Sequence, residues 1–167
     1  MILGLQPKSV LDLGSGFGKF GVLTREYTDI WNGTYEPKDW KVRIDGVEGF
    51  TKYIQNWHYE IYSNIYICNI LDFIPNIKYD LILMIDVLEH FTGEQGEQVL
   101  KMIIENSESA IITTPVQVME QNVVNNNKFE IHRSQWTSDG LIKYGNVFII
   151  SNTFFLNTGK QLFELTE

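Results

Sequence analysis

The sequence has little cysteine, few basic residues and no long hydrophobic run. Cys68 is its single cysteine, which excludes an internal disulfide and fits a reducing compartment. The 13 Lys and Arg residues against 21 Asp and Glu give a net charge of −8, which argues against a broad nucleic-acid or anionic-membrane surface. No apolar run reaches the ~18 residues of a membrane span, and the first residues do not resemble a signal peptide. We therefore expect a cytoplasmic protein with no membrane or nucleic-acid partner.

Length and composition fit a single domain over residues 1–167. Hydrophobic residues make up 44% of the chain and aromatic residues 13%, which is ample material for a core. Short apolar strands alternate with helical patterns from residue 9 to about residue 143, as in a doubly wound, mostly parallel α/β sheet. Residues 147–150 and 153–156 flank a turn and are expected to form an antiparallel hairpin at the sheet edge.

The stretch from Val10 to Gly21 carries the clearest chemical signal. Residues 10–13 are predicted as a buried strand, three glycines follow at alternate positions, and a helix is predicted over about residues 19–27. A turn without Cβ atoms lets a ligand approach the backbone, and the free N–H groups at the start of the helix point toward that ligand. The stretch is expected to cradle a nucleotide-like cofactor; a glycine turn without a ligand is the plainer alternative.

Two glycine registers fit this stretch. Gly16 to Gly21 matches G-x-G-x-x-G, the dinucleotide fingerprint, but it begins past the strand end and leaves Asp12 without a role. The other register, an acid followed by glycines at alternate positions, resembles motif I of class I S-adenosylmethionine (SAM)-dependent methyltransferases. The resemblance implies SAM as the cofactor, bound by Asp12, Gly14, Ser15, Gly16 and Gly18.

The second predicted strand, over residues 42–47, ends at a carboxylate. Glu48 follows it directly, and in nucleotide-binding α/β folds a carboxylate at this place accepts hydrogen bonds from ribose hydroxyls. Asp45 is the rival candidate, but it lies within the strand. We therefore favour Glu48 as the ribose ligand. A helix is expected over about residues 51–57.

The third predicted strand, over residues 64–68, is followed by polar residues. In the methyltransferase family an Asp or Asn just past this strand often contacts the adenine amino group. By position Asn69 matches best, with Ile70 beside it, and Asp72 is the second choice. Asp72 has the alternative role of capping the short helix that follows.

The near-continuous apolar run from Tyr79 to Ile85 is typical of a strand covered on both faces. It leads into the hexapeptide D-V-L-E-H-F, which resembles motif IV of small-molecule methyltransferases and implies that Asp86 and Val87 contact the cofactor. DNA-amino and protein-glutamine methyltransferases carry an Asn/Asp-Pro-Pro-Tyr type motif at this position, which is absent here. His90 is a candidate general base, since imidazole titrates near neutral pH; a structural histidine is the alternative.

The segment from Val116 to Trp136 is long, polar and rich in asparagine. We predict that it forms a mobile lid on the substrate side, with His132 and Trp136 facing the acceptor. His132 is the second candidate base; alternatively it bonds the backbone next to a helix that Ser134 caps. A His-x-Ser-x-Trp sequence here also recurs in a subgroup of bacterial SAM methyltransferases.

The resemblance covers nearly the whole chain and implies a Rossmann-like, seven-stranded sheet of order 3-2-1-4-5-7-6. It also implies transfer of a methyl group from SAM to an oxygen or nitrogen of a small-molecule or sugar-like acceptor. Two alternatives stay open: an NAD(P)-linked oxidoreductase that uses the Gly16 to Gly21 register, and a non-catalytic SAM-binding module. No metal site is expected, and no feature indicates an oligomeric state.

Overall fold

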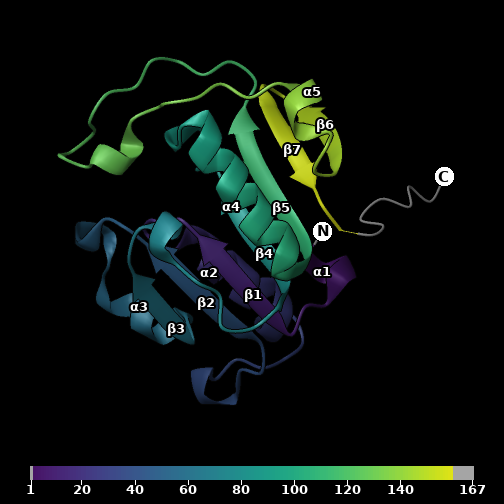
Figure 1. The fold of residues 1–167 in the computed structure, drawn as a ribbon. Helices are drawn as coiled ribbons and strands as arrows, with labels where there is room; N and C mark the ends of the chain where they lie inside the picture. The colour runs from purple at the N-terminus through teal and green to yellow at the C-terminus, as the bar shows by residue number, and fades with distance from the viewer. Residues whose placement is uncertain (1, 160–167) are drawn as a thin grey trace.

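The computed structural model describes residues 2–159, which form a seven-stranded sheet of order β3-β2-β1-β4-β5-β7-β6 (Figure 1). The first five strands in this order pair in parallel, and β7 pairs antiparallel with both β5 and β6. The predicted fold class and strand order are therefore confirmed. The strands are β1 Ser9–Leu13, β2 Arg43–Glu48, β3 Asn64–Ile67, β4 Tyr79–Ile85, β5 Ser107–Pro115, β6 Asn146–Ile150 and β7 Thr153–Asn157.

The helices are short except for one. That helix, α4, begins after Thr92, whose hydroxyl accepts a hydrogen bond from the Gln95 N–H at 3.4 Å, as N-cap residues do. The α-helices are α1 Ile2–Leu5, α2 Lys19–Arg25, α3 Asn56–Ile61, α4 Gly93–Glu105 and α5 Ser138–Leu141. A π-helical turn, η1 Glu26–Ile30, extends α2, and five 3-10 turns are η2 Pro37–Asp39, η3 Thr51–Tyr53, η4 Ile70–Asp72, η5 Leu88–His90 and η6 Lys128–Glu130. None of the helices within residues 2–159 has the length and hydropathy required to cross a membrane.

The prediction of a single helix over about residues 51–57 is wrong. The chain makes the short turn η3, and α3 then begins at Asn56. The N–H of Gln55 donates to Nδ1 of His58 at 3.1 Å, so a side chain three residues into α3 satisfies the backbone at its start. A new helix begins at this cap, where the apolar spacing alone suggested one continuous element.

Alternate residues of the central strands pack into two hydrophobic cores, one on each face of the sheet. The larger core lies under α4 and contains Leu11 of β1 and Ile82 of β4; the smaller lies under α2 and α3 and contains Val10 and Leu81. These four side chains are wholly buried. The arrangement explains the near-continuous apolar strands, since both faces of a parallel sheet are covered.

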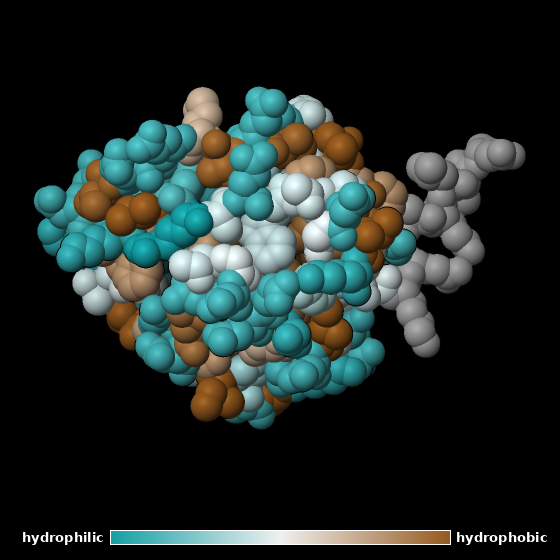
Figure 2. Space-filling view, turned by 45° about the horizontal axis from the view of Figure 1, so that its top comes forward, coloured by the Kyte–Doolittle hydropathy of each residue, from teal (hydrophilic) through white to brown (hydrophobic). Residues whose placement is uncertain are grey.

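The carboxyl ends of β1, β2, β3 and β4 form one edge of the sheet, because these strands are parallel. The segment over residues 116–136 leaves the end of β5 and arches beside this edge, drawn in green at the top of Figure 1. On the face seen in Figure 2, hydrophobic residues occur in small groups separated by hydrophilic ones. Ligands of open α/β sheets bind outside the carboxyl ends of the strands, so this edge is where a site is expected.

Candidate functional site

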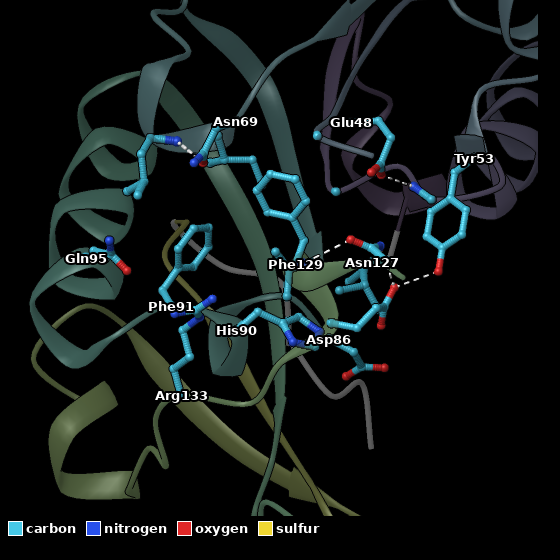
Figure 3. Close-up of a pocket in the computed structure, with 18 residues that line it drawn as sticks. Glu48, Tyr53, Asn69, Asp86, His90, Phe91, Gln95, Asn127, Phe129 and Arg133 are labelled. Atoms are coloured by element: carbon cyan, nitrogen blue, oxygen red, sulfur yellow. Dashed lines mark hydrogen bonds between the residues drawn. The ribbon is translucent and has the colours of Figure 1, made fainter. Parts of the chain in front are cut away.

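A cavity of about 280 Å³ lies at the carboxyl edge of the sheet (Figure 3). Five parts of the chain form it: the turns after β1, β2, β3 and β4, and the arching segment. Its lining consists of Gly14, Gly16, Glu48, Gly49, Tyr53, Asn69, Ile70, Leu71, Ile85, Asp86, Val87, His90, Phe91, Gln95, Asn127, Phe129, Glu130 and Arg133. Most of the predicted cofactor residues are therefore brought together around one cavity, from positions far apart in the sequence.

Two glycines of the turn after β1 line the cavity, for different reasons. Both have positive φ angles, +76° at Gly14 and +53° at Gly16, which glycine adopts readily. A Cβ on Gly14 would lie 2.6 Å from a methyl group of Val87, so this position needs glycine for packing. A Cβ on Gly16 would meet nothing within 4 Å. The open side of Gly16 is the part of the turn that a ligand can approach.

Glu48 ties this turn to the end of β2. Its carboxylate accepts hydrogen bonds from the N–H groups of Gly16 at 2.8 Å and Phe50 at 2.7 Å. Burial raises the pKa of Glu48, whose side chain is 6% exposed. A carboxylate offers about four lone-pair directions, so two bonds leave acceptor capacity on a side chain that lines the cavity.

Asp45 takes no part in the cavity. It is wholly buried within β2, and its carboxylate is engaged by Arg43, Asn64 and Tyr79. Asp45 therefore holds the polar side chains of three strands in place and stabilises the sheet. This placement agrees with the preference for Glu48 over Asp45 as the residue at the crevice.

Asp12, Ser15 and Gly18 are not part of the cavity lining. Asp12 is 1% exposed and accepts a hydrogen bond from the Tyr62 hydroxyl at 2.7 Å. Burial raises the pKa of Asp12 to about 6. The acid of the glycine motif thus lies buried behind the turn, bonded to Tyr62.

His58, which the sequence analysis did not single out, supports the turn from α3. It is wholly buried, and its Nε2 lies 3.0 Å from the carbonyl oxygen of Gly16. The Trp57 indole N–H also donates to the carbonyl of Phe17 at 3.0 Å. No sequence motif predicts these contacts, because they join positions about 40 residues apart that only the fold brings together.

The turns after β3 and β4 place four of the predicted residues at the cavity: Asn69, Ile70, Asp86 and Val87. The side-chain oxygen of Asn69 accepts a hydrogen bond from the Leu71 N–H at 3.0 Å, which caps η4. Asp86 has a φ of +54° and is held by Thr113, whose hydroxyl donates to its carboxylate at 2.7 Å. A non-glycine residue at positive φ is strained, and this one borders the cavity. Asp72 does not line it.

The arching segment closes one side of the cavity. The Tyr53 hydroxyl donates to Oε1 of Glu130 at 2.9 Å, and both residues line the cavity. Nδ2 of Asn127 donates to the same oxygen at 3.2 Å. Phe129 lies over Gly49, where a Cβ would be 3.0 Å from its ring. The segment is therefore attached to the part of the site that follows β2.

The prediction that Trp136 faces the acceptor is wrong. Trp136 is 7% exposed and belongs to the larger core, where its ring packs against Gly96 of α4. A glycine on the inner face of α4 leaves room for the indole, which is why this aromatic side chain turns inward. The part of the segment that lines the cavity lies earlier, at Asn127, Phe129, Glu130 and Arg133.

The two candidate bases, His90 and His132, lie side by side. Their ring centroids are 5.0 Å apart, and His90 lines the cavity whereas His132 does not. Glu89 is adjacent, 2% exposed, and burial raises its pKa to about 7. Burial also lowers the pKa of His90. Ligand atoms of all three residues lie within 4.8 Å of one another, so the structure assembles a set of metal-ligand side chains where no metal site was expected.

No protein-family model and no curated protein matches the sequence. Solved structures do match the fold. The DhpI complex with S-adenosylhomocysteine (SAH) gives a TM-score of 0.65 at 13% identity, covering 89% of this chain and 74% of that one. The methyltransferase domain of bacterial CtHen1-C gives 0.59 at 21% identity over 92% and 90% of the two chains. The N-terminal domain of EvdMO1, in the presence of SAH and D-fucose, gives 0.61 at 11% identity over 90% and 74%.

The chain has the Rossmann-like methyltransferase fold. The expected resemblance to methyltransferases is thus confirmed at the level of the fold. The roles of the individual side chains depend on the geometry described above.

Proposed function

We propose that the chain is a SAM-dependent methyltransferase that methylates an oxygen or nitrogen of a small-molecule or sugar-like acceptor. The observation that carries this proposal is the cavity at the carboxyl edge of the sheet, bordered by the open side of Gly16 and by Glu48. A Cβ-free backbone next to a ribose-accepting carboxylate is what a nucleoside cofactor requires.

The charges around the cavity favour SAM over NAD. Glu48, Asp86 and Glu130 place carboxylates among the described lining residues, against one guanidinium, that of Arg133. SAM carries a positive sulfonium and an ammonium group, whereas NAD carries two negative charges on its pyrophosphate. An acidic site attracts the first and repels the second. The reversed strand β7 also departs from the strand order 3-2-1-4-5-6 typical of dinucleotide-binding folds.

In this proposal each predicted residue has a distinct task. Glu48 accepts from the ribose hydroxyls, Asn69 and Ile70 contact the adenine, and Asp86 and Val87 border the reacting end. The turn at Gly14 and Gly16 holds the methionine part, with Asp12, Ser15 and Gly18 shaping it from behind. The placement of Gly14, Gly16, Glu48, Asn69, Ile70, Asp86 and Val87 around one cavity and the general position of ligands in such sheets support these assignments.

SAM supplies a methyl group on positively charged sulfur, which is already activated toward attack. The protein therefore mainly positions the acceptor in line with that methyl group and excludes water, and positioning alone is worth several kcal/mol. The segment attached through Tyr53 and Glu130 is suited to exclude water. His90 lies at the cavity, where a base for an acceptor proton is needed.

The neighbours support the cofactor and the acceptor class. Two of these structures were determined with SAH, and one of the two also in the presence of D-fucose, a sugar. The test is calorimetry with SAM, SAH and NAD, followed by methyl transfer from labelled SAM to a panel of metabolites. SAM and SAH binding with turnover supports the proposal. NAD binding without SAM binding indicates the oxidoreductase, and SAM binding without turnover on any acceptor indicates a non-catalytic module.

A further inference from the structure

Glu89, His90 and His132 form a compact cluster beside the cavity, from two distant parts of the chain. Glu89 and His90 belong to η5 after β4, and His132 belongs to the arching segment. Three atoms that are all within 4.8 Å of one another lie within about 2.8 Å of their common centre, against metal–ligand bonds of about 2.0–2.2 Å. A shift of under about 1 Å in each side chain would bring all three to bonding distance.

The histidines are oriented by the backbone in the way that metal ligands are. Nδ1 of His132 lies 2.6 Å from the carbonyl oxygen of Met119, and Nδ1 of His90 lies 3.4 Å from that of Ile131. A carbonyl only accepts, so the tautomers that keep these two contacts carry the proton on Nδ1 and leave the Nε2 lone pair available to an ion. Metal-binding histidines almost always donate their other ring N–H to such an acceptor, which fixes the tautomer and the orientation of the ring.

Glu89 supplies a buried carboxylate that lacks a cation. It accepts a hydrogen bond from the Thr114 hydroxyl at 3.1 Å, and among residues 2–159 it forms no ion pair with Lys, Arg or His. A buried carboxylate is stable as an anion only when paired or bound to a metal. Thr114 orders one oxygen of the carboxylate, as second-layer partners of metal-binding carboxylates do.

We propose that Glu89, His90 and His132 bind one divalent transition-metal ion. Two imidazoles and one carboxylate form a donor set that suits Zn²⁺, Mn²⁺, Fe²⁺ or Co²⁺ and leaves coordination positions open. His90 lines the cavity, so an ion held by this cluster would border that cavity. The cluster is thus a metal centre shared between the sheet edge and the lid.

This centre deepens the proposed function and depends on it for its chemical role; His90 would then bind the ion in place of acting as the base. An acceptor hydroxyl that coordinates the ion becomes more acidic, because the ion stabilises the oxyanion. Its proton passes to water, its oxygen forms the new C–O bond, and the C–S bond breaks with its electron pair going to sulfur. The acceptor is then a hydroxyl compound. Acceptors with a second oxygen that can also bind the ion should bind more tightly than those with one.

The experiment measures metal binding directly on the full chain, freed of any polyhistidine tag and of metal by chelation. Zn²⁺ is titrated by calorimetry, and Co²⁺ by its visible absorption. We expect one equivalent to bind, and Glu89→Gln, His90→Asn and His132→Asn each to weaken binding at least about tenfold. Asn keeps a donor near the position of Nδ1, so the loop contacts are retained. Glu94→Gln, on the exposed first turn of α4, is the matched control and should bind normally.

Binding weaker than about 1 mM, or binding that the three variants do not alter, overturns the metal centre. Circular dichroism of each variant shows whether a loss reflects unfolding, and the Co²⁺ absorption of the wild type stands independently of the variants. SAM binding is measured on the same metal-free protein. If SAM binds and metal does not, the metal centre is wrong and the proposed function stands. If metal binds and SAM does not, the metal centre stands and the proposed function is wrong.

Discussion

The carboxylate of Glu48 accepts a hydrogen bond from the N–H of Gly16 at 2.8 Å, joining residues 32 positions apart. This bond connects the two features that the sequence marks as cofactor contacts, the glycine turn and the acid at the end of β2. The position of the carboxylate that we propose to bind the ribose is therefore set by the same backbone that borders the cavity. Changing either residue should affect ligand binding more than it affects the fold.

The first prediction concerns Glu48 and its rival. Glu48→Ala should weaken SAM binding by about 1.5–3 kcal/mol, the range for hydrogen bonds to a charged group. Asp45→Asn should leave SAM affinity within about twofold and lower the free energy of unfolding by about 1–3 kcal/mol, because Tyr79 and Arg43 lose part of a buried partner. Calorimetry gives the affinities and urea denaturation gives the stabilities. Reduced SAM affinity in Asp45→Asn with unchanged affinity in Glu48→Ala would reverse the two assignments.

The second prediction uses two glycines with similar backbones. Gly16 and Gly33 have φ angles of +53° and +82°, and a Cβ on either would meet nothing within 4 Å. Alanine at each should cost about 1–2 kcal/mol in stability. Only Gly16 lines the cavity, so Gly16→Ala should weaken SAH binding at least about tenfold while Gly33→Ala does not. Equal binding by the two variants would make Gly16 a turn residue without a ligand role.

The third prediction concerns pH and Asp12. Burial raises the pKa of Asp12 from 3.8 to about 6, so the folded protein holds this proton more tightly than the unfolded chain does. The stability that the proton provides is complete below pH 3.8 and is lost as pH rises through about 6. Asn resembles the protonated acid, so the advantage of Asp12→Asn over the wild type should grow by about 2–3 kcal/mol between about pH 4 and 7.

This comparison requires cofactor-free protein, because a bound cation favours the charged acid. Urea denaturation of both proteins at several pH values provides the measurement. A stability difference that does not change with pH would mean that Asp12 titrates normally and that its burial has been compensated by its partners.

The fourth prediction concerns the attachment of the arching segment. Tyr53→Phe removes the hydroxyl that donates to Glu130 and keeps the ring contacts with Phe17 and Phe50. The loss of about 1 kcal/mol should speed amide exchange around residues 127–130 by about fivefold, with exchange in β4 unchanged. In the wild type, SAM together with an acceptor should slow exchange across residues 116–136. Exchange that responds neither to the substitution nor to the ligands would reduce this segment to a connector.

The strands could be predicted because their signals are local. Those predicted over residues 42–47, 64–68, 79–85, 147–150 and 153–156 are present with ends shifted by at most one residue. Each is a short stretch bounded by polar or turn residues. The stretch over residues 79–85 is almost continuously apolar because both faces of β4 are covered. That Glu48 lies at the cavity could be predicted for the same reason, since its place at a strand end can be counted along the sequence.

The features that sequence reasoning missed depend on distant contacts. Tyr53 and Glu130 are 77 positions apart, and neither belongs to a motif. Trp136 turns into the core because Gly96 leaves space for it, which cannot be read from the polar residues around it. The cluster of Glu89, His90 and His132 combines a recognised motif with a histidine on another segment, and only the folded chain shows that they meet.

Calorimetry of the purified chain with SAH, with NAD as competitor, decides whether the cavity is a SAM site. We expect one SAH bound per chain with a dissociation constant between about 1 µM and 1 mM, undisturbed by NAD and weakened at least about tenfold in Gly16→Ala. NAD binding at this cavity with no binding of SAH would contradict this expectation.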